Sequence, residues 1–253
     1  MTFVGKVALV VGGASGVGRA MALRMANLGV KVAIVDTDER GLDSTAQQSI
    51  NITPYHCDIS NLQQAQQVVA TVERALGPID RLVHCADWMP TQSLNQMDAE
   101  TINQLMTINY GGTVNMVKVL LPLMEARQSG DIIVFGAMAG DVPALHLGAY
   151  CATKSAIHTF MEVLVRENKH SSVRFVLVCS PPYTVGVGCS RQVAAANARE
   201  IVCPESLIDS VEKALDAKRW VVRPSEVALM AWLRRMLPNL LWWVMERTHK
   251  KQH

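Results

Sequence analysis

The chain has 253 residues, of which 49% are hydrophobic and 18% are charged, a balance typical of a globular domain and not of a disordered or fibrous chain. Its formal net charge is only +2, and no block of Lys and Arg long enough for a nucleic-acid patch precedes the C-terminus. We therefore expect no nucleic-acid partner. The length fits one α/β domain with a sizeable core.

The six cysteines are scattered along the chain, without a C-x-x-C pair and without histidines at metal-ligand spacing. Several lie within apolar runs, where a reduced cysteine behaves as a small buried hydrophobic residue. The first apolar run lacks the features of a signal peptide and is too short to span a bilayer. We expect a reduced, cytoplasmic protein that holds no metal ion.

Seven apolar runs alternate with longer segments of helical periodicity. The expected strands are residues 6–11, 31–36, 53–59, 81–86, 131–137, 173–180 and 219–224. All but the weaker third run are apolar on both faces, as in a parallel sheet covered by helices on both sides. Helix ends are also readable, because Ser60 and Gln63 resemble a capping box, and Gly29 and Gly77 stand where helices should stop. The alternation predicts a single-domain, doubly wound parallel sheet of about seven strands.

The first expected strand is followed by a glycine turn. Gly12, Gly16 and Gly18 form a G-x-x-x-G-x-G pattern at a strand-to-helix boundary, and Asp36 ends the next strand 18 residues after Gly18. Small residues let the backbone approach a pyrophosphate, the helix N-terminus supplies free N–H groups, and the carboxylate accepts from ribose hydroxyls. The pattern predicts a dinucleotide site.

Asp36 also favours NAD(H) over NADP(H), because a carboxylate there repels a 2′-phosphate. Arg19 and Arg40 are the nearby basic residues that could bind such a phosphate. Each is more simply explained as a solvated helix residue.

Tyr150 and Lys154 lie four residues apart in the segment LGAYCATKSAI, which has helical character. Residues at this spacing share one face of a helix. Taken alone, such a pair is more often an ordinary surface pair than an acid/base element.

Taken together and in order, the motifs resemble those of the short-chain dehydrogenase/reductase family over about residues 3–225. The shared motifs are the glycine turn, Asp36, the sequence CDIS with Asp58, Asn109 in TINYGGT, and Tyr150 with Lys154. Each is weak alone, but five in register are specific. The resemblance implies a Rossmann fold with a catalytic domain at residues 1–225 and a helical extension at residues 226–253. It also implies a homodimer or homotetramer.

The resemblance further implies residue roles. Tyr150 would exchange a proton with the substrate oxygen as general acid or base. Lys154 would favour its ionised form and hold the nicotinamide ribose, and Asn109 would hold a water that links Lys154 to solvent. The implied cofactor-binding residues are Gly12, Ser15, Gly16, Val17, Gly18, Asp36, Asp58, Ile59, Cys85, Ala86, Tyr150, Lys154, Pro181 and Thr184.

One departure from the family pattern concerns catalysis directly. Ala137 stands thirteen residues before Tyr150, where the family usually carries a serine. A methyl group cannot donate a hydrogen bond to a carbonyl oxygen, and loss of such a donor commonly costs about a hundred- to a thousand-fold in rate. His146 and Tyr183 are candidates to replace it, although an ordinary loop histidine and a packed tyrosine are the simpler explanations.

Other departures concern the cofactor. Val11 replaces a threonine, Asp87 replaces a glycine close to the cofactor, and Pro182 replaces another glycine. A carboxylate at Asp87 would oppose the pyrophosphate if it pointed inward, and Pro182 removes an N–H group and stiffens its loop. These changes predict weakened or altered cofactor binding.

The substrate side is less defined by sequence. Residues 183–218 form either a mobile lid with Gly186 and Gly188 as hinges, or an ordinary connection packed on the sheet. Expected pocket residues are Trp88, Met89, Met138, Leu145 and Tyr183, which indicate a hydrophobic small-molecule substrate. The tail is rich in Trp, Arg and Lys, and Pro238 should divide it into two short helices. We favour packing on the pocket or a second subunit over peripheral contact with a membrane.

These observations favour an NAD(H)-dependent oxidoreductase that interconverts a secondary alcohol and a ketone. The alternative is a dinucleotide-binding protein without redox activity, such as a pseudoenzyme, a partner subunit or a catalyst of non-redox proton chemistry. The missing serine supports the alternative, whereas the intact Tyr150, Lys154 and Asn109 set opposes it.

Overall fold

A computed structural model describes residues 5–180, 204–240, 242–243 and 247 of the chain. Its centre is a seven-stranded sheet in the order β3-β2-β1-β4-β5-β6-β7, in which every neighbouring pair is parallel. The strands are β1 (Val7–Val11), β2 (Lys31–Asp36), β3 (Ile52–His56), β4 (Arg81–His84), β5 (Gly130–Ala137), β6 (Val173–Ser180) and β7 (Val221–Val222). The predicted doubly wound sheet is confirmed, although β7 is only two residues long.

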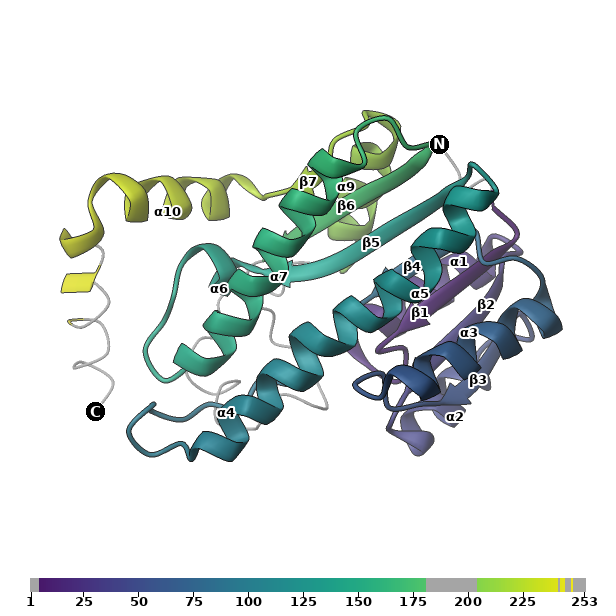
Figure 1. Ribbon diagram of the computed structural model, residues 1–253, viewed down its shortest axis with the longest axis horizontal. Coiled ribbons are helices and arrows are strands. Elements are labelled where there is room, and N and C mark those ends of the chain that lie inside the picture. Colours follow the sequence, from purple (N-terminus) through teal and green to yellow (C-terminus); the bar gives the residue numbers. More distant parts are fainter. Residues whose placement is uncertain (1–4, 181–203, 241, 244–246, 248–253) are drawn as a thin grey trace.

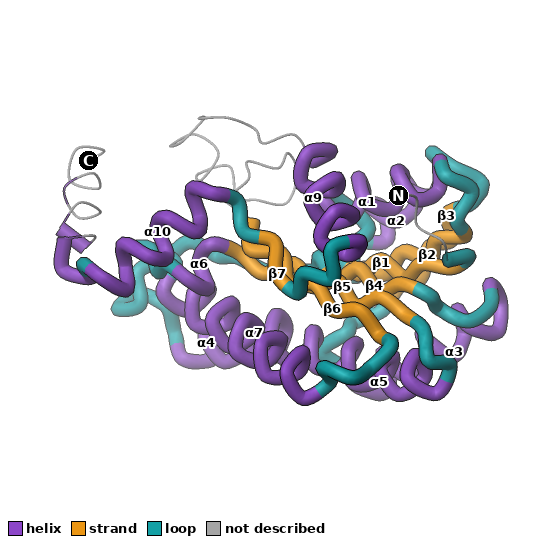
Figure 2. Tube along the Cα trace, turned by 90° about the horizontal axis from the view of Figure 1, so that it is seen from above, coloured by secondary structure: helices purple, strands orange, loops and turns teal. Residues whose placement is uncertain are grey.

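Helices cover both faces of the sheet, as Figure 2 shows. One face carries α1 (Gly16–Asn27), α2 (Glu39–Ala46) and α9 (Pro204–Asp216). The other carries α3 (Leu62–Leu76), α4 (Ala99–Leu105), the π-helix η1 (Met106–Gly111), α5 (Gly112–Ala126) and α7 (Gly148–Glu167). Each face has its own hydrophobic cluster, because strands that are apolar on both sides need cover on both sides.

The helix caps differ from the sequence prediction in one place. The predicted capping box at Ser60 and Gln63 is wrong, because α3 is capped by Asn61, whose side chain accepts from the Gln64 N–H. Ser60 is committed elsewhere, since its hydroxyl donates to Asp58 at 2.7 Å. The stops at Gly29 and Gly77 lie where expected, just after α1 and at the end of α3.

The strand order reverses at β1, which has β2 on one side and β4 on the other. In an open parallel sheet, chain connections leave this point in opposite directions and open a crevice beyond the carboxyl ends of the strands. The residues singled out by the motifs follow these carboxyl ends. The topology therefore brings them to one edge of the sheet.

The opposite edge is held by a buried ionic network that the sequence analysis did not anticipate. Arg81 is 1% exposed and bonds Asp131 through two nitrogens, at 2.8 and 3.0 Å. Arg174 bonds the same carboxylate at 2.6 Å, and Glu212 bonds Arg81 at 2.5 Å. Because its charges satisfy one another, the network joins the starts of three strands to α9 without leaving an unpaired buried charge.

The C-terminal region extends away from the body of the molecule (Figure 1). The short helix α6 (Met138–Asp141) follows β5, and α10 (Ser225–Met236) follows β7. Helical structure is interrupted at Leu237, just before Pro238, which agrees with the predicted division of the tail. Large apolar side chains on this region are exposed, among them Leu229, Trp232 and Trp243. Among the described helices, none combines the length and the apolar character needed to cross a bilayer.

Candidate active site

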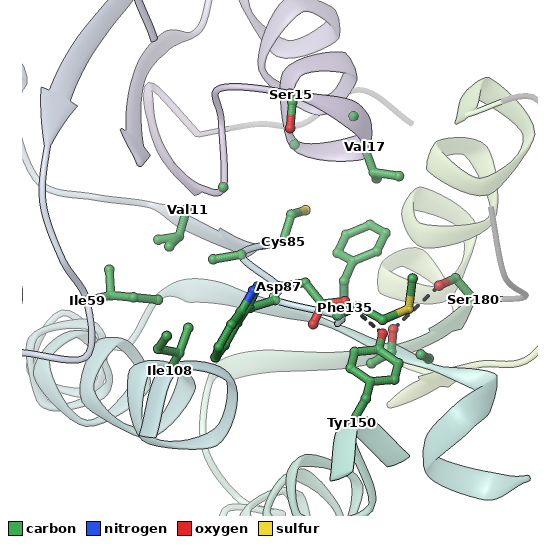
Figure 3. Close-up of a pocket in the computed structure, with 18 of the residues that line it drawn as sticks. Val11, Ser15, Val17, Ile59, Cys85, Asp87, Ile108, Phe135, Tyr150 and Ser180 are labelled. Atoms are coloured by element: carbon green, nitrogen blue, oxygen red, sulfur yellow. Dashed lines mark hydrogen bonds between the residues drawn. The ribbon is translucent and has the colours of Figure 1, made fainter. Parts of the chain in front are cut away.

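A cavity of about 720 Å³ opens at the carboxyl edge of the sheet. Figure 3 shows its lining, with the glycine turn at one end and Tyr150 at the other. Predicted residues along it are Gly12, Ser15, Gly16, Val17, Gly18, Asp36, Asp58, Ile59, Cys85, Ala86 and Tyr150, together with Trp88, Met89 and Met138. Leu145 and His146 are not among its lining residues. Pro181, Pro182, Tyr183, Thr184, Gly186 and Gly188 lie outside the described part of the chain.

The glycine turn is shaped by close backbone approaches. Gly12 has φ +83°, and a Cβ atom there would lie 2.6 Å from the backbone nitrogen of Ala86. A Cβ atom at Gly18 would overlap the carbonyl oxygen of Gly12. No residue with a side chain fits these contacts, so the turn depends on glycine at both positions.

Asp36 stabilises the same turn. One of its carboxylate oxygens accepts from the Ala14 N–H at 3.2 Å, and the other accepts from the Thr37 N–H at 2.8 Å. The side chain therefore lies between the glycine turn and the end of β2, at the rim of the cavity. Arg19 is not a free surface residue, because its guanidinium donates hydrogen bonds to the Thr45 hydroxyl at 2.9 Å and to the Ala14 carbonyl oxygen.

Tyr150 and Lys154 share one face of α7, as their spacing predicts. Tyr150 is 4% exposed and Lys154 is 2% exposed. The Lys154 ammonium lies 5.5 Å from the centre of the Tyr150 ring and donates to the Phe135 carbonyl oxygen at 3.3 Å. Tyr150 therefore lines the cavity, whereas Lys154 is buried beside it and is not among the lining residues, and the two do not form an ordinary surface pair.

Asp87 is the unexpected member of this group. The Tyr150 hydroxyl donates to Asp87 Oδ2 at 2.7 Å, and Lys154 Nζ lies 3.2 Å from Asp87 Oδ1. From the sequence alone, this carboxylate was expected only to oppose the pyrophosphate. In the structure it is directed at the acid/base pair instead (Figure 3).

Asn109 lies in η1, where a π-helix interrupts the helical segment between α4 and α5. Its amide nitrogen donates to the Trp88 carbonyl oxygen at 2.9 Å and to the Thr153 hydroxyl at 3.2 Å. Its amide oxygen accepts from the Trp88 N–H at 2.9 Å. Asn109 thus fixes the loop after β4, a role that the sequence analysis did not foresee.

Two further titratable groups lie at the end of β4, namely His84, its last residue, and Cys85, which follows it and lines the cavity. Burial, and then the Lys154 charge, lower the pKa of His84 from 6.5 to about 3. Burial also raises the pKa of the Cys85 thiol. Both side chains are therefore neutral at physiological pH, and His84 Nε2 has no hydrogen-bond partner among the described residues.

Ala137 ends β5 and leaves no hydroxyl at the position where the family carries a serine. Its partner in the register of the sheet is Ser180, the last residue of β6. Ser180 also lines the cavity, and its hydroxyl makes a long hydrogen bond, 3.4 Å, to the Gly136 carbonyl oxygen. Sequence reasoning missed Ser180, because only the pairing of β5 with β6 places it beside Ala137.

A second polar cluster lies next to the cavity. His158 Nδ1 is 3.3 Å from Asp141, and His158 Nε2 is 3.8 Å from the Cys179 sulfur. These three residues have metal-ligand chemistry, but Arg223 bonds both Asp141 oxygens, at 2.9 and 3.1 Å. The guanidinium neutralises the carboxylate, so the cluster serves to hold α6 against β6 and the segment before α10.

Sequence and structure comparisons show which known proteins this chain is similar to. A family model of short chain dehydrogenases matches residues 6–198. The dehydrogenase/reductase SDR family protein 7-like of Anopheles gambiae is 27% identical, over 98% of this chain and 84% of the relative.

Two solved structures are also similar. A short chain dehydrogenase/reductase of Burkholderia phymatum in complex with NAD has a TM-score of 0.83 at 23% identity, covering 95% of this chain and 96% of that chain. A variant of actinorhodin polyketide ketoreductase with NADPH has a TM-score of 0.71 at 26% identity, covering 89% and 88%. With the family model matching most of its length, the chain belongs to the short-chain dehydrogenase/reductase family, a family of Rossmann-fold oxidoreductases.

Proposed function

We propose that this protein is an NAD(H)-dependent oxidoreductase that interconverts a secondary alcohol and a ketone on an apolar small molecule. The observation that carries the proposal is the buried Tyr150 hydroxyl at the cavity with the Lys154 ammonium beside it. Family membership supports the reaction class. The names of two similar proteins, a dehydrogenase/reductase and a ketoreductase, agree with it.

The residues present fit a nicotinamide dinucleotide. Glycine at positions 12 and 18 lets the turn pack closely against its own backbone. The turn lines the cavity at the N-terminus of α1, where free N–H groups could hold a pyrophosphate. Asp58 and Ile59 line the cavity beyond it, where the adenine would bind. When bound, the cofactor supplies or accepts the hydride.

The chain itself would move the proton. In ketone reduction the Tyr150 hydroxyl donates its proton to the substrate oxygen, and in alcohol oxidation Tyr150 accepts it. Lys154 is held in place by the Phe135 carbonyl oxygen, so its charge stays beside the Tyr150 ring, 5.5 Å from the ring centre. Asn109 positions the loop that carries Asp87 and Trp88, and through that loop it keeps the wall of the cavity in place.

The preference for NAD(H) rests on Asp36. Its carboxylate is fixed at the end of β2 by backbone N–H groups, so it would accept from ribose hydroxyls and repel a 2′-phosphate. The preference for an apolar substrate rests on the cavity wall, which includes Trp88, Met89, Met138 and Val142. We also propose that the protein works in the cytoplasm as a homodimer or homotetramer.

The second candidate is a dinucleotide-binding protein without redox activity. Ala137 favours it, because the position that usually donates to the substrate carbonyl carries only a methyl group. In this case the cavity would bind the nucleotide, and the chain would act through a partner or in non-redox proton chemistry.

Fluorescence titration with NADH and NADPH, followed by a screen of alcohols and ketones, separates the candidates. The main proposal expects tighter binding of NADH than of NADPH and turnover of an apolar secondary alcohol or ketone. Failure to bind either nucleotide contradicts both candidates. Binding without turnover of any substrate supports the second.

A further inference from the structure

We propose that Asp87 is a positioning residue that holds Tyr150 as a neutral proton donor, which sets this site for carbonyl reduction at neutral pH. The inference rests on the proposed function, since it concerns the same acid/base residue. It goes further by assigning a role to a carboxylate that replaces a glycine of the family pattern.

The contacts define what Asp87 does. Its Oδ2 atom accepts the Tyr150 hydroxyl proton at 2.7 Å, while its Oδ1 atom lies 3.2 Å from the Lys154 ammonium. A carboxylate can only accept, so Tyr150 must be protonated to make this bond. Ionised Tyr150 would lose the bond and would place two negative oxygens side by side. Asp87 also offsets part of the Lys154 charge that would otherwise favour ionised Tyr150.

Asp87 is held in this position by its loop. Asn109 bonds both the N–H and the carbonyl oxygen of Trp88, the next residue, each at 2.9 Å. On the other side, the Ala86 backbone packs against Gly12 so closely that no Cβ atom fits between them. Two neighbours of Asp87 are therefore fixed, and the carboxylate is presented to Tyr150 by a constrained segment.

Asp87 and Lys154 are charged groups that contact Tyr150, and the other described groups packed around the pair are uncharged. On β4, burial keeps His84 neutral, with its pKa lowered to about 3, and burial raises the pKa of the Cys85 thiol. The uncharged amide of Asn109, in η1, also lies next to the pair and bonds the Thr153 hydroxyl. The Phe135 carbonyl oxygen, in β5, accepts a hydrogen bond from Lys154. Within the described part of the chain, Asp87 is thus the anion that accepts from the Tyr150 hydroxyl.

The consequence is directional. Alcohol oxidation needs Tyr150 as a base, whereas ketone reduction needs it as an acid. By opposing ionised Tyr150, Asp87 shifts oxidation to more alkaline pH and leaves the proton donor of reduction in place at neutral pH.

The test uses the near-ultraviolet absorbance of the phenolate, measured as a function of pH on the full chain, with and without saturating NAD⁺. Subtracting the titration of Tyr150→Phe isolates Tyr150. Asp87→Asn keeps the shape of the side chain and removes its charge. We expect Tyr150 phenolate to appear at lower pH in this variant, with roughly tenfold or more phenolate at a given pH below the midpoint.

Asp87→Gly, which carries the residue of the family pattern, should shift the titration in the same direction and provides a second variant. Glu100→Gln removes an exposed carboxylate in the first turn of α4, outside the cavity lining, and should leave the titration unchanged. An unchanged or more alkaline titration in both Asp87 variants would overturn the proposal. Because the readout needs no substrate, it separates this inference from the proposed function, which fails only if nucleotide binding or turnover fails.

Discussion

The two halves of the sheet differ in how closely they keep the pattern of the family. Around β1 and β2 the glycine turn, Asp36 and the helix N-terminus of α1 are all present, and the backbone contacts of Gly12 and Gly18 explain why. Around β5 and β6 the serine position carries Ala137, and Asp87 enters the site from the loop after β4.

The difference follows from what each half must fit. A dinucleotide has a constant shape, so its turn tolerates few side chains. A substrate pocket has no such constant partner, and its residues can change with the substrate. The following predictions test this division, beginning with the largest expected effect.

In the nucleotide-binding half of the sheet, around β1 and β2, we expect the largest loss of stability and of NADH binding from a substitution at Gly12. Gly12→Ala combines positive φ with overlap on Ala86, which we expect to lower the free energy of unfolding by about 3 kcal/mol. The variant should lose measurable NADH binding in a fluorescence titration. Gly29→Ala is the matched control, because Gly29 has φ +81° with nothing within 4 Å of the added Cβ. It should cost only about 1 kcal/mol and bind NADH normally. Equal effects at both sites would contradict the close-approach argument.

In the substrate-binding half of the sheet, around β5 and β6, a substitution at Ala137 should raise the rate of catalysis. Ala137→Ser restores a hydroxyl at the end of β5, beside Ser180, and should raise kcat for a ketone by up to about a hundredfold if a missing donor limits the rate. Ser180→Ala in the wild-type background should lower kcat if Ser180 partly serves as that donor. Steady-state kinetics with NADH measures both. A serine variant without gain, together with a Ser180→Ala variant without loss, would mean that no donor is limiting.

His84 should make the protein sensitive to acid. Its pKa is about 3 in the folded chain against an ordinary value of 6.5, so the unfolded chain takes up the proton first as pH falls below 6.5. Stability is therefore lost as pH falls from 6.5 towards 3, by about 2 kcal/mol at pH 5. His84→Asn should reduce this loss between pH 7 and pH 5, measured by urea unfolding. If the variant loses as much stability as the wild type, His84 is not responsible.

Substitutions in the exposed C-terminal tail should have the smallest effect on NADH affinity. Trp232 and Trp243 are 56% and 49% exposed, and no residue of α10 lines the described cavity. Trp232→Gln with Trp243→Gln should leave NADH affinity within about twofold but shift the protein to a smaller assembly in light scattering, because exposed apolar faces commonly mark interfaces. Ile50→Gln, at another exposed apolar residue, is the control. An unchanged assembly with reduced sedimentation on anionic liposomes would point to a membrane surface instead.

Sequence predicted the fold well because its signals are local. The apolar runs at residues 31–36 and 173–180 match β2 and β6 in full, since both strands are covered on two sides. The predicted strand at residues 219–224 is reduced to Val221–Val222, and the cap moved from Ser60 to Asn61 because Asp58 binds the Ser60 hydroxyl. Boundaries depend on such single contacts, which periodicity does not encode.

The candidate site was predictable only where the chemistry is local. The spacing of Tyr150 and Lys154 on one helix was readable, and so was the glycine turn. The contact between Tyr150 and Asp87 joins residues 63 positions apart, and the pairing of Ala137 with Ser180 joins two strands. Neither relation has a signal in a single sequence. The unusual carboxylate in HCAD did draw attention to Asp87, but as a residue opposing the pyrophosphate and not as the partner of Tyr150.

The central claim is that Tyr150 is the proton-exchanging residue of a redox site, and a paired measurement of turnover and nucleotide affinity tests it most directly. Tyr150→Phe removes the hydroxyl that faces Asp87, whereas Tyr110→Phe alters a tyrosine that packs edge-on against Phe160. We predict that Tyr150→Phe lowers kcat by about a hundredfold or more, with NADH affinity close to that of the wild type. Tyr110→Phe should retain turnover. Undiminished turnover in Tyr150→Phe would contradict the account.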